Sequence, residues 1–177
     1  MSEPAGDERV NRISVTNAVL ALLLVGLLGW LMLFAVRGDV AAPGSTPAEE
    51  RAQEHAAISR AARAETLAFL TIDHTKMDQL TEKVLDGATG DFKKQYQASL
   101  KSLKESAASQ ESFSTGRVDE VGLSEIDADS ASVFVAAGSK VKNRGTKGEV
   151  EDRSWRIKLT MAKEDSRWLV SNLEFVG

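Results

Sequence analysis

The chain contains no cysteine, and this absence excludes a disulfide framework, a thiol nucleophile and a metal site built from thiolates. It also lacks a strong charge of one sign, because its formal net charge is −4 at pH 7 and no basic stripe runs along it. Nucleic acid is therefore not an expected partner. Histidine is scarce, since His55 and His74 are the two in the chain. They are far apart with no third ligand at a recognisable offset, which argues against a metal site.

Charge is also absent from residues 13–36, which Arg12 and Arg37 bracket. At about 1.5 Å per residue this run spans roughly 36 Å as a helix, against a hydrocarbon core of about 30 Å. We therefore expect a retained transmembrane helix over residues 13–36, following a cytoplasmic tail of residues 1–12. A buried core helix is one alternative, but such helices usually have a shorter apolar stretch.

A cleaved signal peptide is the other alternative for this run. Signal peptides have an apolar core of about 7–15 residues and a small-residue cleavage site. The apolar core here is longer, and Val40, Ala41 and Ala42 follow only after Arg37 and Asp39. A membrane anchor is therefore the favoured interpretation.

Residues 37–46 predict a short linker, because Gly38, Pro43 and Gly44 discourage regular structure. Ten residues extend at most about 36 Å, so a domain over residues 47–177 would work close to the bilayer. Basic residues lie on both sides of the expected span and favour a cytoplasmic N-terminus only slightly. We expect a single-pass protein of the cell membrane whose C-terminal domain is extracytoplasmic.

The sequence Thr46-Pro47-Ala48-Glu49 is typical of a helix start, with Thr46 as the N-cap and Pro47 in the first turn. A helix is predicted from there to about residue 70, followed by a break over residues 71–75 and helices over about 77–85 and 91–109. Apolar residues at helical spacing support all three. They are Ile58, Ala62, Phe69 and Ile72, then Met77, Leu80 and Val84, and then Phe92, Tyr96, Leu100, Leu103 and Ala107.

After Gln110 the apolar residues alternate with a period of two, which is typical of half-buried strands. Four strands are predicted, over about residues 113–123, 131–137, 155–161 and 167–176. The clearest alternations are Ala131, Val133, Val135 and Ala137, and Trp155, Ile157, Leu159 and Met161. Three helices followed by four strands joined by short turns predict an α+β domain, with the helices on one face of a curved antiparallel sheet.

Several short motifs, in this order and spacing, resemble the actinobacterial Mce-associated membrane proteins, which are accessory subunits of mammalian-cell-entry (Mce) lipid transporters. The motifs are Leu70-Thr71-Ile72-Asp73-His74 with Met77-Asp78, Ala88-Thr89-Gly90-Asp91-Phe92 with Tyr96, Thr115-Gly116-Arg117-Val118, and Trp168-Leu169-Val170 with Leu173. The resemblance implies a cone-shaped domain of the nuclear-transport-factor-2-like or cystatin-like kind. The inner-membrane scaffold protein of type IV secretion systems has a similar domain and anchor. The resemblance further implies that the protein stabilises or assembles an Mce complex, with Mce subunits or a permease as partners.

Some cone-shaped domains of this type are enzymes, so residues that could act as general acids or bases are candidates for a catalytic site. Asp73, His74, Asp78 and Tyr96 could gather at the mouth of a cone. A general base needs a tuned pKa and a water-poor pocket, which the sequence does not indicate. Aspartate at a helix break is favoured as a turn residue. We therefore expect no catalytic, cofactor-binding or metal site.

Three further patterns have competing interpretations. The turn from Gly87 to Gly90 lacks the Gly-Lys-Ser/Thr of a phosphate loop, so no nucleotide is expected and a helix–helix turn is favoured. A basic group between two strands is either a solvated hairpin tip or a contact for anionic headgroups or an acidic partner. Two tryptophans at strand starts are either core anchors or interface residues. The basic group is Lys140, Lys142, Arg144 and Lys147, and the tryptophans are Trp155 and Trp168.

The leading hypothesis is thus a non-enzymatic accessory scaffold of an Mce-type lipid import complex, in contact with the lipid bilayer. A scaffold of another envelope machine, such as a type IV secretion system, is the first alternative. A lipid-binding or enzymatic cone is the second.

The absence of cysteine makes the expected topology testable with one substitution. A Ser45→Cys variant should react with a membrane-impermeant thiol reagent on intact cells, because residue 45 is expected outside the membrane. Labelling that appears only after lysis would contradict the outward orientation, and the unsubstituted chain is the blank.

Overall fold

The computed structural model describes residues 46–177, of which Ala48–Gly177 form one compact unit. The predicted tail, the predicted span over residues 13–36 and all but the last residue of the predicted linker lie outside the described residues. Within residues 46–177, no helix is both long and apolar enough to cross a membrane.

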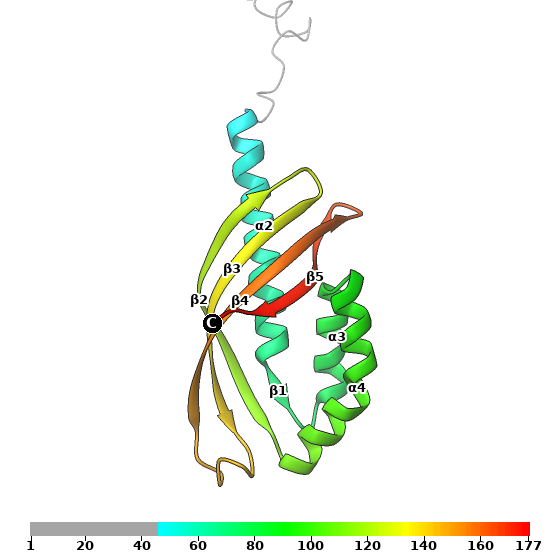
Figure 1. Ribbon diagram of the computed structural model, residues 1–177, viewed down its shortest axis with the longest axis vertical. Coiled ribbons are helices and arrows are strands. Elements are labelled where there is room, and N and C mark those ends of the chain that lie inside the picture. Colours follow the sequence, from blue (N-terminus) through cyan, green and yellow to red (C-terminus); the bar gives the residue numbers. More distant parts are fainter. Residues whose placement is uncertain (1–45) are drawn as a thin grey trace, which may run out of the picture. The chain divides into compact units, whose positions relative to one another are not determined.

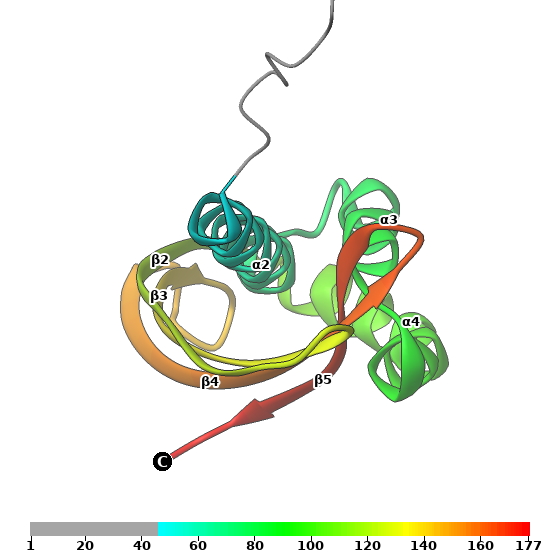
Figure 2. The same ribbon diagram turned by 90° about the horizontal axis from the view of Figure 1, so that it is seen from above.

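The three helices predicted within residues 47–177 are all present in the described domain. They are α2 (Pro47–Leu70), α3 (Met77–Gly87) and α4 (Gly90–Gln110). Figure 2 shows α2 on the concave side of the curved sheet, with α3 and α4 beside it near β5. The helices therefore occupy one face of the sheet, as the α+β prediction requires.

The sheet has five strands where the sequence predicts four. They are β1 (Ile72–Asp73), β2 (Phe113–Ile126), β3 (Ser130–Lys142), β4 (Glu151–Glu164) and β5 (Arg167–Phe175), in the order β1-β2-β3-β4-β5 (Figure 1). Every neighbouring pair is antiparallel, which confirms the predicted order of the four long strands.

The unpredicted strand β1 lies in the stretch interpreted as a simple break between helices. Ile72 pairs with Ser114 and Asp73 with Phe113. Two residues cannot display a period of two, so only the distant partner strand reveals them as a strand. The sequence pattern places Ile72 on the apolar stripe of the first helix. In the structure Ile72 instead belongs to the sheet.

The core lies between the concave face of the sheet and the helices. The alternating residues of β3 and β4 face inward, and their register brings Val133 opposite Leu159 and Val135 opposite Ile157. Ile58 of α2 is fully buried against this face. Burying each such side chain is worth about 1.5–3 kcal/mol, so this layer supplies much of the driving force for folding. The other buried members are Ala62, Leu70, Val84, Ala88, Phe92, Ala131, Ala137, Met161, Trp168 and Val170.

The end of α2 touches β2 closely. The Ser114 hydroxyl donates a hydrogen bond of 2.7 Å to the Leu70 carbonyl, which is one of the carbonyls left unpaired at the end of a helix. Gly116 lies two residues after Ser114 in β2, and a Cβ built on it would lie 2.8 Å from the Leu70 Cβ. A glycine is therefore required where the strand passes the end of the helix.

This contact predicts that Gly116→Ala destabilises the domain by ~1–3 kcal/mol, because the added methyl group must push α2 away from β2. Gly122→Ala is the matched control in the same strand, since its Cβ would meet only the Phe134 carbonyl oxygen, at 4.0 Å. Chemical denaturation should show a change of less than about 0.5 kcal/mol for the control. Equal effects of the two substitutions would contradict the steric account.

Candidate functional site

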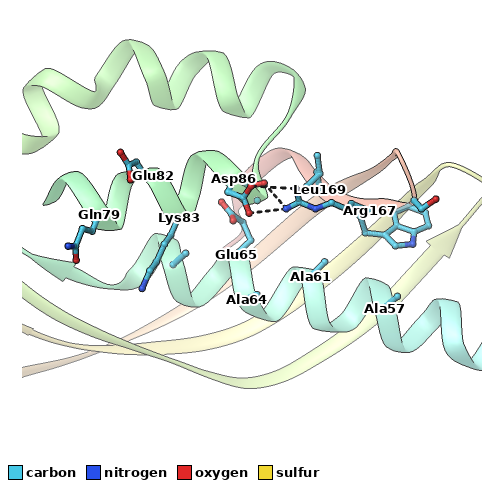
Figure 3. Close-up of a pocket in the computed structure, with 14 residues that line it drawn as sticks. Ala57, Ala61, Ala64, Glu65, Gln79, Glu82, Lys83, Asp86, Arg167 and Leu169 are labelled. Atoms are coloured by element: carbon cyan, nitrogen blue, oxygen red, sulfur yellow. Dashed lines mark hydrogen bonds and ion pairs between the residues drawn. The ribbon is translucent and has the colours of Figure 1, made fainter. Parts of the chain in front are cut away.

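A large hollow in the described domain lies along α2. It has a volume of about 880 Å³ and lies between α2, α3 and the turn that joins β4 to β5 (Figure 3). We call it the α2–α3 groove. Its α2 wall is made of short side chains at helical spacing, namely Ala57, Ala61, Ala64 and Ala68.

The opposite wall of the groove is formed by α3 and the start of β5. It is polar on α3 and at Arg167, and apolar at Trp168 and Leu169. Arg167 at the start of β5 donates to the Asp86 carboxylate at 2.9 Å and to the Asp86 carbonyl at 3.2 Å (Figure 3). Both side chains are largely exposed, so the ion pair adds little stability, but it joins the β4–β5 turn to the end of α3. The remaining lining residues of this wall are Gln79, Glu82, Lys83, Gly87, Ser166, Trp168 and Leu169.

Glu65 of α2 is the unusual residue of the groove. Its side chain is 3% exposed, and within the described part of the chain its Oε1 atom has no hydrogen-bond partner. The carboxyl group packs against Gly87, where an added Cβ would overlap it. Burial and, to a smaller extent, the negative charge of Asp86 together raise the pKa of Glu65 to about 8. Glu65 is therefore mostly protonated at neutral pH.

Sequence reasoning missed Glu65, although a signal was present. Glu65 follows Ile58 by seven positions and Ala62 by three, which places it on the face of α2 that faces the core. A carboxylate on an apolar helical face is rarely buried without a partner. Helical spacing therefore identifies the buried face of α2. Glu65 is the charged residue that interrupts the apolar pattern on that face.

A second hollow of about 410 Å³ lies between α2, α4 and the sheet. Phe69 of α2 contacts Tyr96 of α4 at 6.3 Å between ring centroids and Phe175 of β5 at 6.2 Å. Trp155 contacts Phe175 at 5.3 Å, and its indole nitrogen donates to the Ser139 hydroxyl at 2.9 Å. We call this hollow the aromatic pocket. Burial raises the pKa of Tyr96 to about 12, and the nearby Glu65 carboxylate also contributes.

The structure does not bring together the four predicted acid–base residues. Tyr96 lines the aromatic pocket, whereas His74 and Asp78 line a separate surface hollow. Asp73 accepts hydrogen bonds from the Thr75 hydroxyl at 2.6 Å and from the Thr75 backbone at 3.0 Å, and these hold its pKa below the usual value.

The other two predicted acid–base residues have structural partners of their own. The His74 ring lies edge-on to Phe113, with the centroids 4.9 Å apart, and Asp78 forms a 2.6 Å ion pair with Lys104. His55 is exposed on α2. Residues 46–177 contain no group of three or more potential ligands that could hold a metal ion.

The basic group between β3 and β4 is placed differently from its prediction. Lys140 and Lys142 lie within β3, so only Arg144 and Lys147 belong to the connecting loop. Strand β3 is longer than predicted because its polar end pairs with the equally polar start of β4, where no apolar alternation marks a strand. Arg144 forms a 2.6 Å ion pair with Glu111. Figure 1 places this loop at the end of the domain opposite the start of α2.

The tryptophans and the glycine turn have structural roles. Trp168 is buried in the core, and Trp155 is half-buried and packs against the core cluster. Gly90 has a positive φ of 53°, as expected for a turn between helices. The turn is also held to the sheet, because the Thr89 N–H donates to the Val170 carbonyl at 2.8 Å.

A family model described as "Uncharacterized protein Rv1363c/MT1408-like" matches residues 12–177. A curated relative from Mycobacterium tuberculosis, the uncharacterized protein Rv1363c, is 30% identical over 130 residues. The alignment covers 73% of this chain and 49% of that protein, so the chain spans about half the length of the curated relative.

Several solved structures share the fold at low sequence identity. An IcmL-like type IV secretion system protein from Legionella pneumophila matches with a TM-score of 0.57 at 16% identity, covering 68% of this chain and 91% of that one. The periplasmic domain of DotI has a TM-score of 0.55 at 7% identity, covering 77% and 99%. Agrobacterium tumefaciens VirB8 has a TM-score of 0.54 at 8% identity, covering 70% and 92%. These matches confirm the predicted likeness in fold to type IV secretion domains, while the Mce association stays a prediction.

The buried carboxyl group predicts a pH dependence of stability. The folded-state pKa of Glu65 lies above its ordinary value of 4.5, so its favourable contribution is complete below pH 4.5 and is lost as the pH rises through about 8. Relative to Glu65→Gln, which does not titrate, the wild-type chain should lose ~2 kcal/mol or more of unfolding free energy between pH 5 and pH 9, at about 1.4 kcal/mol per unit of pKa shift. Denaturation of the full chain in detergent, followed by circular dichroism, measures this.

Glu82→Gln is the control for that experiment, because Glu82 is exposed on the rim of the same groove. Its stability should follow the wild-type pH profile. Parallel profiles for wild type and Glu65→Gln would show that Glu65 is not held protonated in the folded domain.

Proposed function

Because this chain belongs to the Rv1363c/MT1408-like family and its domain has the fold of type IV secretion proteins, we propose that it is a non-enzymatic scaffold subunit of a protein machine in the cell envelope. The single observation that carries the proposal is the likeness of the whole described domain to such proteins, including the periplasmic domain of DotI. The predicted span over residues 13–36 would hold this domain close to the outer face of the cell membrane.

The surface of the domain supports a role in binding other proteins. The α2–α3 groove is open, and its wall of alanines lets another backbone approach α2 closely. Small side chains favour close packing of helices because they leave room for the partner's ridges. The separation of His74 and Asp78 from Tyr96 supports a non-enzymatic role, since acid–base catalysis needs such groups within reach of one substrate.

Two classes of machine fit this proposal. The likeness of fold favours a secretion-type assembly. The short motifs of the sequence resemble Mce-associated proteins and favour an Mce-type lipid import complex, with a permease or Mce subunits as partners. The subunits that co-purify with the chain distinguish the two.

A small apolar ligand is a second candidate function, and the aromatic pocket is the observation that favours it. Its volume of about 410 Å³ and its lining by Phe69, Tyr96 and Trp155 suit an acyl chain or a similar apolar group. Native mass spectrometry of the full chain released from detergent would show a retained lipid as a discrete mass increment. A single ligand-free mass would argue against this second function.

Affinity purification of the tagged full chain from detergent-solubilised membranes tests the scaffold proposal. We expect subunits of one membrane machine to be recovered, and Ala64→Arg to lower their recovery several-fold because its side chain fills the groove. Ala136→Arg is the matched control, since Ala136 is exposed on β3 and does not line the groove. Recovery of no envelope-machine subunit with the wild-type chain would contradict the proposal.

A further inference from the structure

Building on the proposed scaffold function, we propose that the α2–α3 groove receives a lysine or arginine side chain from a helical segment of a partner protein, and that Glu65 is its ion-pair acceptor. The inference rests on a buried acceptor without a donor, on the charges around it, and on the shape of the wall beside it.

Glu65 provides a buried acceptor that the chain itself leaves unused. Its Oε1 atom is buried and has no hydrogen-bond partner within residues 46–177, although Glu65 lines the open groove. A buried polar group without a partner is unfavourable, and natural domains rarely keep one without a reason. Figure 3 shows the side chain projecting from α2 towards Asp86 in the groove.

The cations that line the groove do not neutralise Glu65. Arg167 is held by the carboxylate and the carbonyl of Asp86, which use its guanidinium group. Lys83 is exposed on α3 and forms no ion pair with Glu65 in the described part of the chain. With Glu65 protonated, the carboxylates of Asp86 and Glu82 balance the cations Arg167 and Lys83. Ionisation of Glu65 would leave one negative charge in excess, which a positively charged visitor would balance and an acidic one would not.

The shape of the groove favours a helix over a small amine. Its α2 wall runs from Ala57 to Ala68, which is about 16 Å at helical rise, and every lining residue of that wall except Glu65 is an alanine. A small amine would occupy only the part near Glu65. A helical segment would use the whole alanine wall and could place apolar side chains against Trp168 and Leu169 at the β5 side.

An ion pair with Glu65 has a distinctive linkage to pH. The free groove holds Glu65 mostly protonated below pH 8, because burial and Asp86 raise its pKa. An arriving ammonium group favours the carboxylate, so binding releases a proton. Affinity should therefore rise by up to about tenfold per pH unit from pH 6 to pH 8 and then level off. The other groups facing Glu65 are Glu82 and Lys83 of α3, Arg167 of β5 and Tyr96 of α4.

The test uses the full chain in detergent and synthetic helical peptides of about 17 residues, alanine-based, with one central lysine. A matched peptide has norleucine in place of that lysine, and n-butylamine represents the small-amine source. Fluorescence anisotropy of the labelled peptides, with empty micelles as the blank, gives the affinities at pH 6, 7, 8 and 9. We expect the lysine peptide to bind at least tenfold more tightly than the norleucine peptide at pH 8, with the rise in affinity described above.

Two variants assign the effect to the buried carboxyl group. Glu65→Gln should abolish both the preference for lysine and the pH dependence, while circular dichroism shows an unchanged fold. Glu120→Gln, which is exposed on β2 and outside the groove, should keep both within about twofold of wild type. Equal binding of the two peptides, absence of binding, or an unchanged preference in Glu65→Gln would overturn the inference. Butylamine binding as tightly as the lysine peptide would also overturn it, because the ligand would then be a small amine.

The proposed ion pair of Glu65 and the proposed scaffold function can fail independently of each other. If envelope-machine subunits co-purify with the chain but Glu65→Gln binds the lysine peptide as wild type does, the scaffold function stands and only the role of Glu65 fails. If no subunit co-purifies while the peptide preference is present, the groove chemistry stands without the machine.

Discussion

The packing of α2 into the concave face of the sheet is the interaction on which the rest of the domain depends. Ile58 and Ala62 of α2 are completely buried in the core with residues of β3 and β4, so the second half of the helix is fixed. Because α2 is held there, its opposite edge meets α3 and the β4–β5 turn, and the α2–α3 groove forms between them. Displacing α2 would remove the core and the groove together.

The same packing forces Glu65 into an environment that a carboxylate disfavours. Its position on α2 is set by helical geometry, its carboxyl group packs against Gly87, and no donor within residues 46–177 reaches Oε1. The domain tolerates the group by keeping it protonated, at the cost of an unsatisfied oxygen atom. Such a compromise is typical of binding sites, where a group that lowers stability is retained for a ligand.

The family and the fold limit the function without defining it. The chain belongs to the Rv1363c/MT1408-like family, and its fold is shared with type IV secretion proteins at identities of 7–16%. At that distance a fold conveys architecture, and function depends on the particular surface built on it. In this domain the surface features with a physical reason to bind something are the alanine-lined groove with its carboxyl group and the aromatic pocket.

Periodicity by itself determined the α+β class, the three helices and the four long strands, because patterns such as Val133-Val135 and Ile157-Leu159 reflect local geometry that repeats along the chain. It could not reveal β1, whose two residues are a strand only because Phe113 and Ser114 pair with them. Nor could it show that Tyr96 lies apart from His74 and Asp78, or that Glu65 lacks a partner. Those facts depend on which distant segments meet, and only the packing of α2, α3 and β5 against one another decided them.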